Sequence, residues 1–265
     1  KHITLESEVL TKADHIVVTS ATTKKEFQKI TQTPIEVITN GYDSNDNFKL
    51  NLDIKFTLSH IGTLLSNRNP IVLWEALSEL CSENPEFSKD LLIQLAGSVS
   101  DAILISIQKY GLMDQCIALG YLSHQKAIQL QYNSQVLLLI EMNLPETKAI
   151  IPGKLFEYLA AKRPILAIGP VDSDVEKIIE ETNSGSYFDY SEKEKLKKRK
   201  PPKSKNLKFQ NLQFKKSKFE NSIQNLTFKN YKLKNMKSTN QKTQSKSLKR
   251  KNFKLKSFKL KTPKS

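Results

Sequence analysis

The sequence predicts an α/β protein whose main domain is a Rossmann-like, doubly wound parallel sheet, followed by a basic, disordered tail. Three observations support this prediction. Short apolar runs alternate with helical patterns of about 10 to 15 residues, which is typical of successive βαβ units. Glycines directly follow several of the apolar runs, as they do where a sheet edge binds a ligand. The net charge changes sign near residue 190.

Residues 1–48 are expected to be the end of one domain and a linker. Because the first residue is Lys1 rather than Met, we expect the chain to begin within a longer protein. Asn40-Gly41 is a turn signal before a polar linker. The elements expected here are a helix that ends at Ala13-Asp14, a strand at 15–19, a helix at 20–30 and a strand at 35–38.

Residues 49–190 are expected to form the sheet domain. The strands predicted from apolar runs cover residues 55–61, 91–96, 116–119, 136–140, 164–168 and 187–190. The helices predicted between them cover residues 70–81, 101–110, 124–131, 153–162 and 174–182. Right-handed crossovers then bring the loops after each strand to one edge of the sheet, where such folds bind ligands.

Residues 191–265 form a Lys-rich, low-complexity tail. They carry 26 Lys and Arg against 3 Asp and Glu, a net charge of +23, whereas residues 1–190 carry 16 against 24, a net charge of −8. Two interpretations stay open: a frameshift artefact in an A/T-rich gene, or a genuine tail that binds an anionic membrane surface or, non-specifically, nucleic acid. An independent folded domain is disfavoured, because no sustained helical or strand period runs through the tail.

The run from Pro152 to Pro170 carries the most chemical information. A helix is expected to begin at Gly153, with its N-terminal N–H groups free to hold an anion. Lys154 lies in the first turn, where a cation is unfavourable unless an anion lies nearby. Glu157, one turn later, can accept hydrogen bonds from sugar hydroxyls. Phosphate and hydroxyl groups side by side indicate a nucleoside diphosphate.

Four segments, taken in order, resemble the GT-B glycosyltransferases, in particular the family 4-like enzymes of bacterial polysaccharide synthesis. They are AD-x-I-V-x-T-S from Ala13, I-x-N-G-Y-D from Ile38, I-G-T-L-x₃-R-N-P from Ile61, and P-G-K-L-F-E-Y-L-A from Pro152. The resemblance covers roughly residues 5–190. It implies that residues 49–190 are the nucleotide-sugar-binding domain and that residues 1–48 end the acceptor domain.

The resemblance also implies a diphosphate site on two loops. It places Gly62, Thr63 and Arg68 there from the first loop, and Gly153 and Lys154 from the second. Many relatives have Arg at the position of Thr63. From spacing alone, an ordinary turn with a solvated Arg68 fits the first loop equally well.

The nucleoside is expected to lie beside the predicted helices at 124–131 and 153–162. The resemblance assigns the ribose to Glu157 and the base-side loop to Tyr121 and Leu122, for which core packing is the alternative. Relatives with two glutamates in this motif have the first at the position of Ala149, so the donor sugar stays open. Catalytic residues are not assigned.

The function implied is transfer of a sugar from a nucleotide-diphosphate sugar to a glycan or lipid-linked acceptor hydroxyl, in the cytoplasm or at the inner membrane face. This chain by itself is expected to be inactive. The alternatives are a nucleotide-sugar 2-epimerase, or a non-catalytic donor-domain or anionic-surface binding module. No specific nucleic acid and no cofactor are expected. No metal is expected either, because the four His and two Cys have no metal-ligand spacing.

Overall fold

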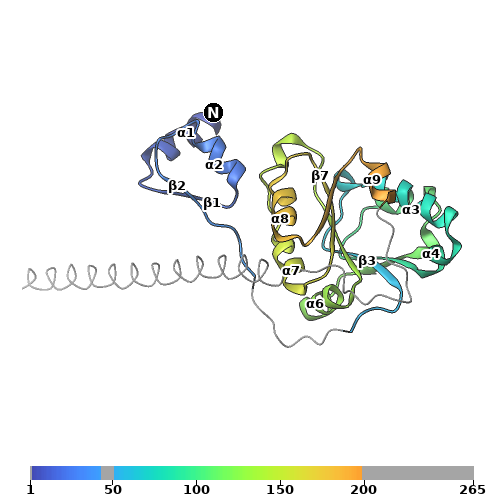
Figure 1. The fold of residues 1–265 in the computed structure, drawn as a ribbon. Coiled ribbons are helices and arrows are strands. Elements are labelled where there is room, and N and C mark those ends of the chain that lie inside the picture. Colours follow the sequence, from blue (N-terminus) through green and yellow to red (C-terminus); the bar gives the residue numbers. More distant parts are fainter. Residues whose placement is uncertain (1, 43–50, 199–265) are drawn as a thin grey trace, which may run out of the picture. The chain divides into compact units, whose positions relative to one another are not determined.

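The computed structural model describes residues 2–42 and 51–198 (Figure 1). Residues 2–42 contain helices α1 (His2–Lys12) and α2 (Ala21–Phe27) and the parallel strands β1 (Ile16–Val18) and β2 (Ile35–Val37). The Ser20 hydroxyl caps α2 by accepting a hydrogen bond from the backbone N–H of Thr23 at 3.1 Å, as expected of an N-cap serine.

Residues 51–198 form a six-stranded, all-parallel sheet. Its strands are β3 (Phe56–Ile61), β4 (Leu91–Ala96), β5 (Cys116–Gly120), β6 (Val136–Ile140), β7 (Ile165–Gly169) and β8 (Gly185–Asp189). Their order in the sheet is β5-β4-β3-β6-β7-β8. The predicted Rossmann-like fold is therefore confirmed, and the strand order reverses between β3 and β6, the usual position of a ligand in such sheets.

Helices cover both faces of this sheet. Figure 1 shows α3, α4 and α9 on one face, and α6, α7 and α8 on the other. Their bounds are α3 (Ile71–Glu83), α4 (Pro85–Asp90), α5 (Asp101–Lys109), α6 (His124–Asn133), α7 (Gly153–Ala161), α8 (Asp174–Thr182) and α9 (Lys193–Lys198). Because both faces are covered, β6 and β7 are continuous apolar runs, and β4 is apolar except for half-buried Gln94.

The short helix α9 lies in the range that the sequence assigned to the Lys-rich tail. Leu196 is buried in the core that α3 covers, and the lysines on either side reach α3. The amine of Lys193 pairs with the carboxylate of Glu79 at 3.0 Å, and that of Lys197 pairs with Glu83 at 3.0 Å. Residues 193–198 thus belong to the folded domain, whereas the rest of the predicted tail, 199–265, and most of the expected linker lie outside the described residues.

Candidate functional site

The loops after the neighbouring strands β3 and β4 approach each other through bare backbone, beside the point where the strand order reverses. Gly62 and Gly97 follow β3 and β4 with positive φ angles of 122° and 109°. A Cβ atom built on Gly97 would lie 2.6 Å from the carbonyl oxygen of Gly62. Only glycine allows this approach, so Gly97, which the sequence left as an ordinary strand end, fixes the position of the Gly62 turn.

Lys154 reaches from the first turn of α7 to this turn. A Cβ atom on Gly62 would lie 3.1 Å from the Lys154 Nζ, so glycine also leaves room for the amine. Burial, followed by the charge of Arg68, lowers the pKa of Lys154 to about 8, while Glu157 acts in the opposite direction. No side chain caps the first turn of α7, whose N-terminal residue follows Pro152.

Arg68 converges on the same place from the short 3₁₀ turn Ser66–Arg68. Arg68 and Lys154 both line a cavity of about 30 Å³. Among the described residues, the Arg68 Nε is buried without a hydrogen-bond partner, and no carboxylate lies within 4.0 Å of either cation. Two neighbouring cations, one of them with an unused donor, form a site that favours an anion.

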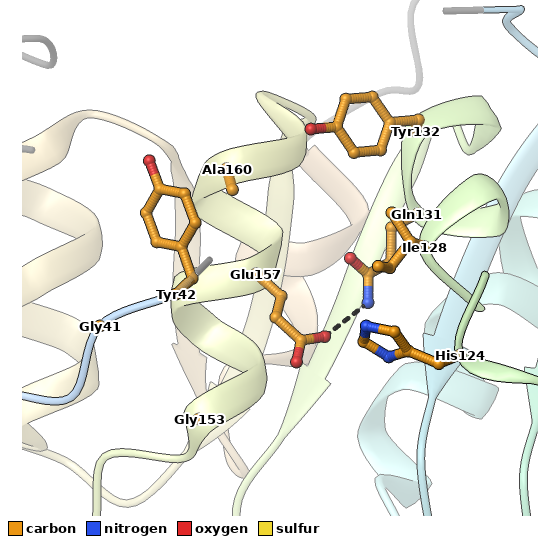
Figure 2. A pocket seen from close by; sticks show the side chains of 9 residues that line it. All are labelled: Gly41, Tyr42, His124, Ile128, Gln131, Tyr132, Gly153, Glu157 and Ala160. Atoms are coloured by element: carbon orange, nitrogen blue, oxygen red, sulfur yellow. Dashed lines mark hydrogen bonds between the residues drawn. The ribbon is translucent and has the colours of Figure 1, made fainter. Parts of the chain in front are cut away.

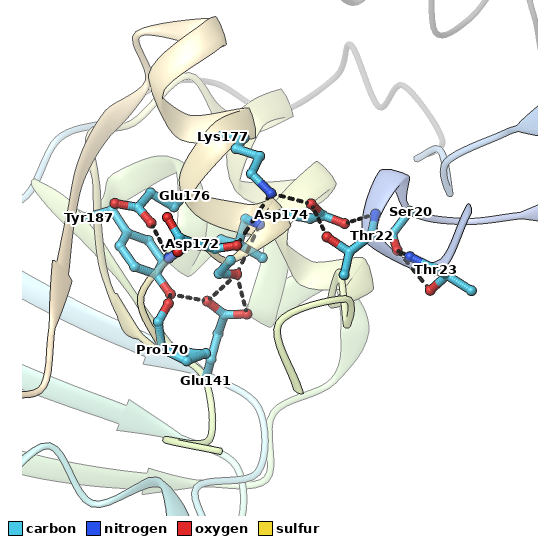
Figure 3. Close-up of polar contacts among 12 residues, drawn as sticks. Ser20, Thr22, Thr23, Glu141, Pro170, Asp172, Asp174, Glu176, Lys177 and Tyr187 are labelled. Atoms are coloured by element: carbon cyan, nitrogen blue, oxygen red, sulfur yellow. Dashed lines mark hydrogen bonds and ion pairs between the residues drawn. The ribbon is translucent and has the colours of Figure 1, made fainter. Parts of the chain in front are cut away.

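Glu141, which the sequence analysis did not select, lies on the wall of this cavity directly after β6. It is 6% exposed, and its carboxylate accepts hydrogen bonds from the hydroxyls of Ser173 at 3.1 Å and Tyr187 at 2.8 Å (Figure 3). Burial raises the pKa of Glu141 to about 7. The signal in the sequence was one charged residue at the end of an otherwise apolar run, VLLLIE.

Glu157 lies one turn along α7, in a pocket of about 360 Å³ between α6 and α7 (Figure 2). Its carboxylate accepts a hydrogen bond from the Gln131 amide of α6 at 2.8 Å. The pocket is lined by Gly41, Tyr42, His124, Ile128, Gln131, Tyr132, Gly153, Glu157 and Ala160. It has the volume of a small-ligand site, and a polar group is fixed on its wall.

The remaining predicted residues are less enclosed. Thr63 is exposed on the Gly62 turn, and Tyr121 is 93% exposed, so it does not pack in the core. Leu122 is half-buried, and neither Tyr121 nor Leu122 lines the pocket beside Glu157. The structure thus brings together Gly62, Arg68 and Lys154, places Gly153 and Glu157 on the adjacent pocket, and leaves Tyr121 outside it.

Two properties bear on the class of site. In residues 2–42 and 51–198, no three His, Cys, Asp or Glu side chains are placed to hold a metal ion together. None of the helices in these two segments has the length and apolar character needed to span a bilayer.

The comparison with solved structures identifies the fold. The chain is similar to HepE from Anabaena, solved with UDP and glucose, at 17% identity and a TM-score of 0.57, over 74% of this chain and 55% of that one. It is similar to sucrose-phosphate synthase from Thermosynechococcus elongatus, at 17% identity and a TM-score of 0.56, over 74% and 50%. The fold is that of the GT-B glycosyltransferases.

A third GT-B structure shares this architecture. WaaG, a glycosyltransferase involved in lipopolysaccharide biosynthesis, matches at 16% identity and a TM-score of 0.51, over 69% of this chain and 51% of WaaG. The chain therefore spans about half the length of the GT-B proteins it matches. No family profile and no curated protein sequence matches it.

Proposed function

We propose that this chain supplies the donor-binding part of a glycosyltransferase and that it binds the diphosphate of a nucleotide sugar between Arg68, Lys154 and the N-terminus of α7. The observation that carries the proposal is the convergence of the two cations on one cavity at the end of β6. Their charges are unpaired among the described carboxylates, and an anion would relieve their repulsion.

The nucleoside would extend along α7 toward Glu157. The carboxylate of Glu157 faces the pocket and uses one oxygen for Gln131, which leaves the other oxygen to accept a ribose hydroxyl. Several GT-B structures similar to this chain were solved with UDP, among them HepE. This supports a uridine nucleotide as the first donor to test.

In transfer, the bond between the anomeric carbon and the nucleoside diphosphate breaks as a bond to the acceptor oxygen forms, and the acceptor's proton passes to the departing phosphate or to solvent. Arg68, Lys154 and the α7 N-terminus would stabilise the charge that develops on the leaving diphosphate. We take the acceptor to be a glycan or lipid-linked hydroxyl in polysaccharide synthesis, on the cytoplasmic side of the membrane. Glu141 is a further ionisable group beside the cations, and because burial raises its pKa to about 7 it is only partly ionised near neutral pH.

The test is calorimetry of the complete 265-residue chain with UDP, GDP and TDP and with inorganic pyrophosphate. We expect at least one nucleoside diphosphate to bind, and to bind more tightly than pyrophosphate because Glu157 adds a ribose contact. If none of the nucleotides binds at millimolar concentration, the donor-site proposal is wrong. If a nucleotide sugar is converted at C2 without any acceptor, the 2-epimerase alternative holds instead.

A further inference from the structure

A fully buried histidine lies beneath the proposed phosphate site. His60, in β3, is 0% exposed, and both of its ring nitrogens face polar atoms. The Nδ1 atom lies 3.1 Å from the carbonyl oxygen of Leu138 in the neighbouring strand β6. The Nε2 atom lies 3.4 Å from the Nζ of Lys154.

These two contacts define the state of the ring. A carbonyl oxygen only accepts hydrogen bonds, so Nδ1 carries the proton and Nε2 presents its lone pair to Lys154. Burial, followed by the charge of Lys154, lowers the pKa of His60 to about 3, although the Leu138 and Thr63 carbonyls act in the opposite direction. The ring is therefore neutral near pH 7, and its Nε2 can accept a hydrogen bond.

We propose that His60 is a positioning residue that holds the Lys154 amine at the phosphate site. A free lysine side chain has four rotatable bonds, and ordering it on a ligand costs affinity. Here the Lys154 amine already contacts Nε2 of His60, and it lies next to Gly62, which has no side chain to compete for the space. Since His60 is itself tied to Leu138, the amine position is set by the two strands where the order reverses. This inference rests on the proposed function of Lys154.

Two substitutions separate the two ring contacts. An asparagine amide reaches the position of Nδ1, so His60→Asn keeps a donor for Leu138 and removes the acceptor for Lys154. A glutamine oxygen reaches the position of Nε2, so His60→Gln keeps the acceptor and loses the donor. If positioning is the role, His60→Asn weakens UDP binding by about tenfold, the size of one hydrogen bond to a charged group, whereas His60→Gln stays within about threefold of the wild type.

A double-mutant cycle separates positioning from general damage to the fold. In a Lys154→Met background the histidine has no amine to hold, so His60→Asn and His60→Gln should leave the remaining UDP affinity unchanged within about twofold. Equal losses from both substitutions in the wild-type background would overturn the inference. So would a loss from His60→Asn that persists with Met at position 154.

Nuclear magnetic resonance of the complete chain tests the contact without any ligand. The ¹⁵N shifts of the His60 ring in the wild type should show a protonated Nδ1, and an Nε2–H tautomer would contradict the inference. The pKa of Lys154 should be lower in His60→Asn than in the wild type, because the Nε2 lone pair that stabilises the ammonium form is lost. In His60→Gln the pKa should be close to the wild-type value, because the glutamine oxygen replaces that acceptor. If the wild type binds no UDP, the proposed function fails, and the Lys154 titration still decides whether His60 holds the amine.

Discussion

The hydroxyl of Tyr158 in α7 accepts a hydrogen bond from the backbone N–H of Ile61, the last residue of β3, at 3.1 Å. Tyr158 is fully buried. This pair joins the helix that carries Lys154 to the strand that ends at Gly62, so the two halves of the candidate site are connected through the core as well as at the surface.

Replacing Tyr158 with phenylalanine should lower the free energy of unfolding by about 1 to 3 kcal/mol, since the Ile61 N–H loses its buried partner. Urea denaturation followed by circular dichroism measures this. The matched control is Tyr121→Phe, which removes a hydroxyl from a side chain that is 93% exposed and should change stability by less than about 0.5 kcal/mol. Equal effects at the two positions would show that the Ile61 contact contributes nothing.

Arg68→Ala should weaken the binding of both UDP and pyrophosphate by about tenfold or more, because a charge-assisted contact to the diphosphate is lost. Stability should change by no more than about 0.5 kcal/mol, since Arg68 forms no ion pair with a described carboxylate. Calorimetry and thermal unfolding measure the two effects, with exposed Lys126→Ala as the control for loss of one positive charge. A destabilised variant with unchanged affinity would make Arg68 a structural residue.

Glu157→Ala should weaken UDP binding by about 1.5 to 3 kcal/mol, the range for a hydrogen bond to a charged group, and should leave pyrophosphate binding unchanged. This pattern differs from that of Arg68→Ala, which affects both ligands. Gln131→Ala is the control, because it removes the Gln131–Glu157 hydrogen bond but keeps the carboxylate. Unchanged affinity of Glu157→Ala for UDP, GDP and TDP would remove Glu157 from the ribose site.

Glu141 should make stability fall as the pH rises. Burial raises the pKa of Glu141 to about 7 from an unperturbed value of 4.5, so the folded protein holds a proton that the unfolded chain releases between these values. Its contribution to stability is complete below pH 4.5, is lost progressively up to pH 7, and is constant above it. The loss is of the order of 3 kcal/mol, from 1.36 kcal/mol for each unit of pKa difference.

The measurement compares urea denaturation of the wild type and Glu141→Gln at several values between pH 5 and 8. A difference is needed because His60 acts with the opposite sign: its lowered pKa makes stability rise with pH up to about 6.5. Both proteins contain His60, so the difference between the two curves isolates Glu141. The advantage of Glu141→Gln over the wild type should grow with pH. Parallel curves would mean that the carboxyl titrates normally.

Two truncations test the place of α9. A chain that ends at Lys198 should keep a cooperative thermal transition within a few degrees of the full chain, as expected of a folded part that needs no tail. A chain that ends at Tyr190 loses Leu196 from the core, and a buried leucine contributes about 2 to 5 kcal/mol, so its melting temperature should fall by several degrees. Loss of folding in the chain that ends at Lys198 would instead place a packing partner within residues 199–265.

The sequence predicted the sheet well because its central strands are largely apolar and buried. The runs 91–96, which has one polar residue (Gln94), and 136–140 match β4 and β6 residue for residue. Helix α9 was missed because Leu196 is one apolar residue among lysines, and the glutamates that pair with those lysines lie in α3, over a hundred residues earlier.

The two buried polar residues of the site were missed for a related reason. His60 lies within the predicted strand 55–61 between Ser59 and Ile61, where a single polar residue gives no signal, and Glu141 follows an apolar run, where it looks like a strand boundary. Their partners are distant in sequence: Lys154 lies 94 residues after His60, and Tyr187 lies 46 residues after Glu141. The loop residues Gly62 and Arg68, by contrast, were selected through the resemblance to GT-B glycosyltransferases, and Lys154 was selected because it is a cation in the first turn of the predicted helix.

The backbone contact between Gly62 and Gly97 restricts how this site can diversify. A side chain at Gly97 would collide with the backbone of Gly62, and a side chain at Gly62 would crowd the Lys154 amine, so this part of the proposed phosphate site would be the same whatever donor is bound. Any preference for one sugar or base over another must therefore arise from residues that have room to vary. Exposed Thr63 on the first loop is one such position, and under the proposed function exchanging it would change donor preference while Gly62 and Gly97 keep the turn in place.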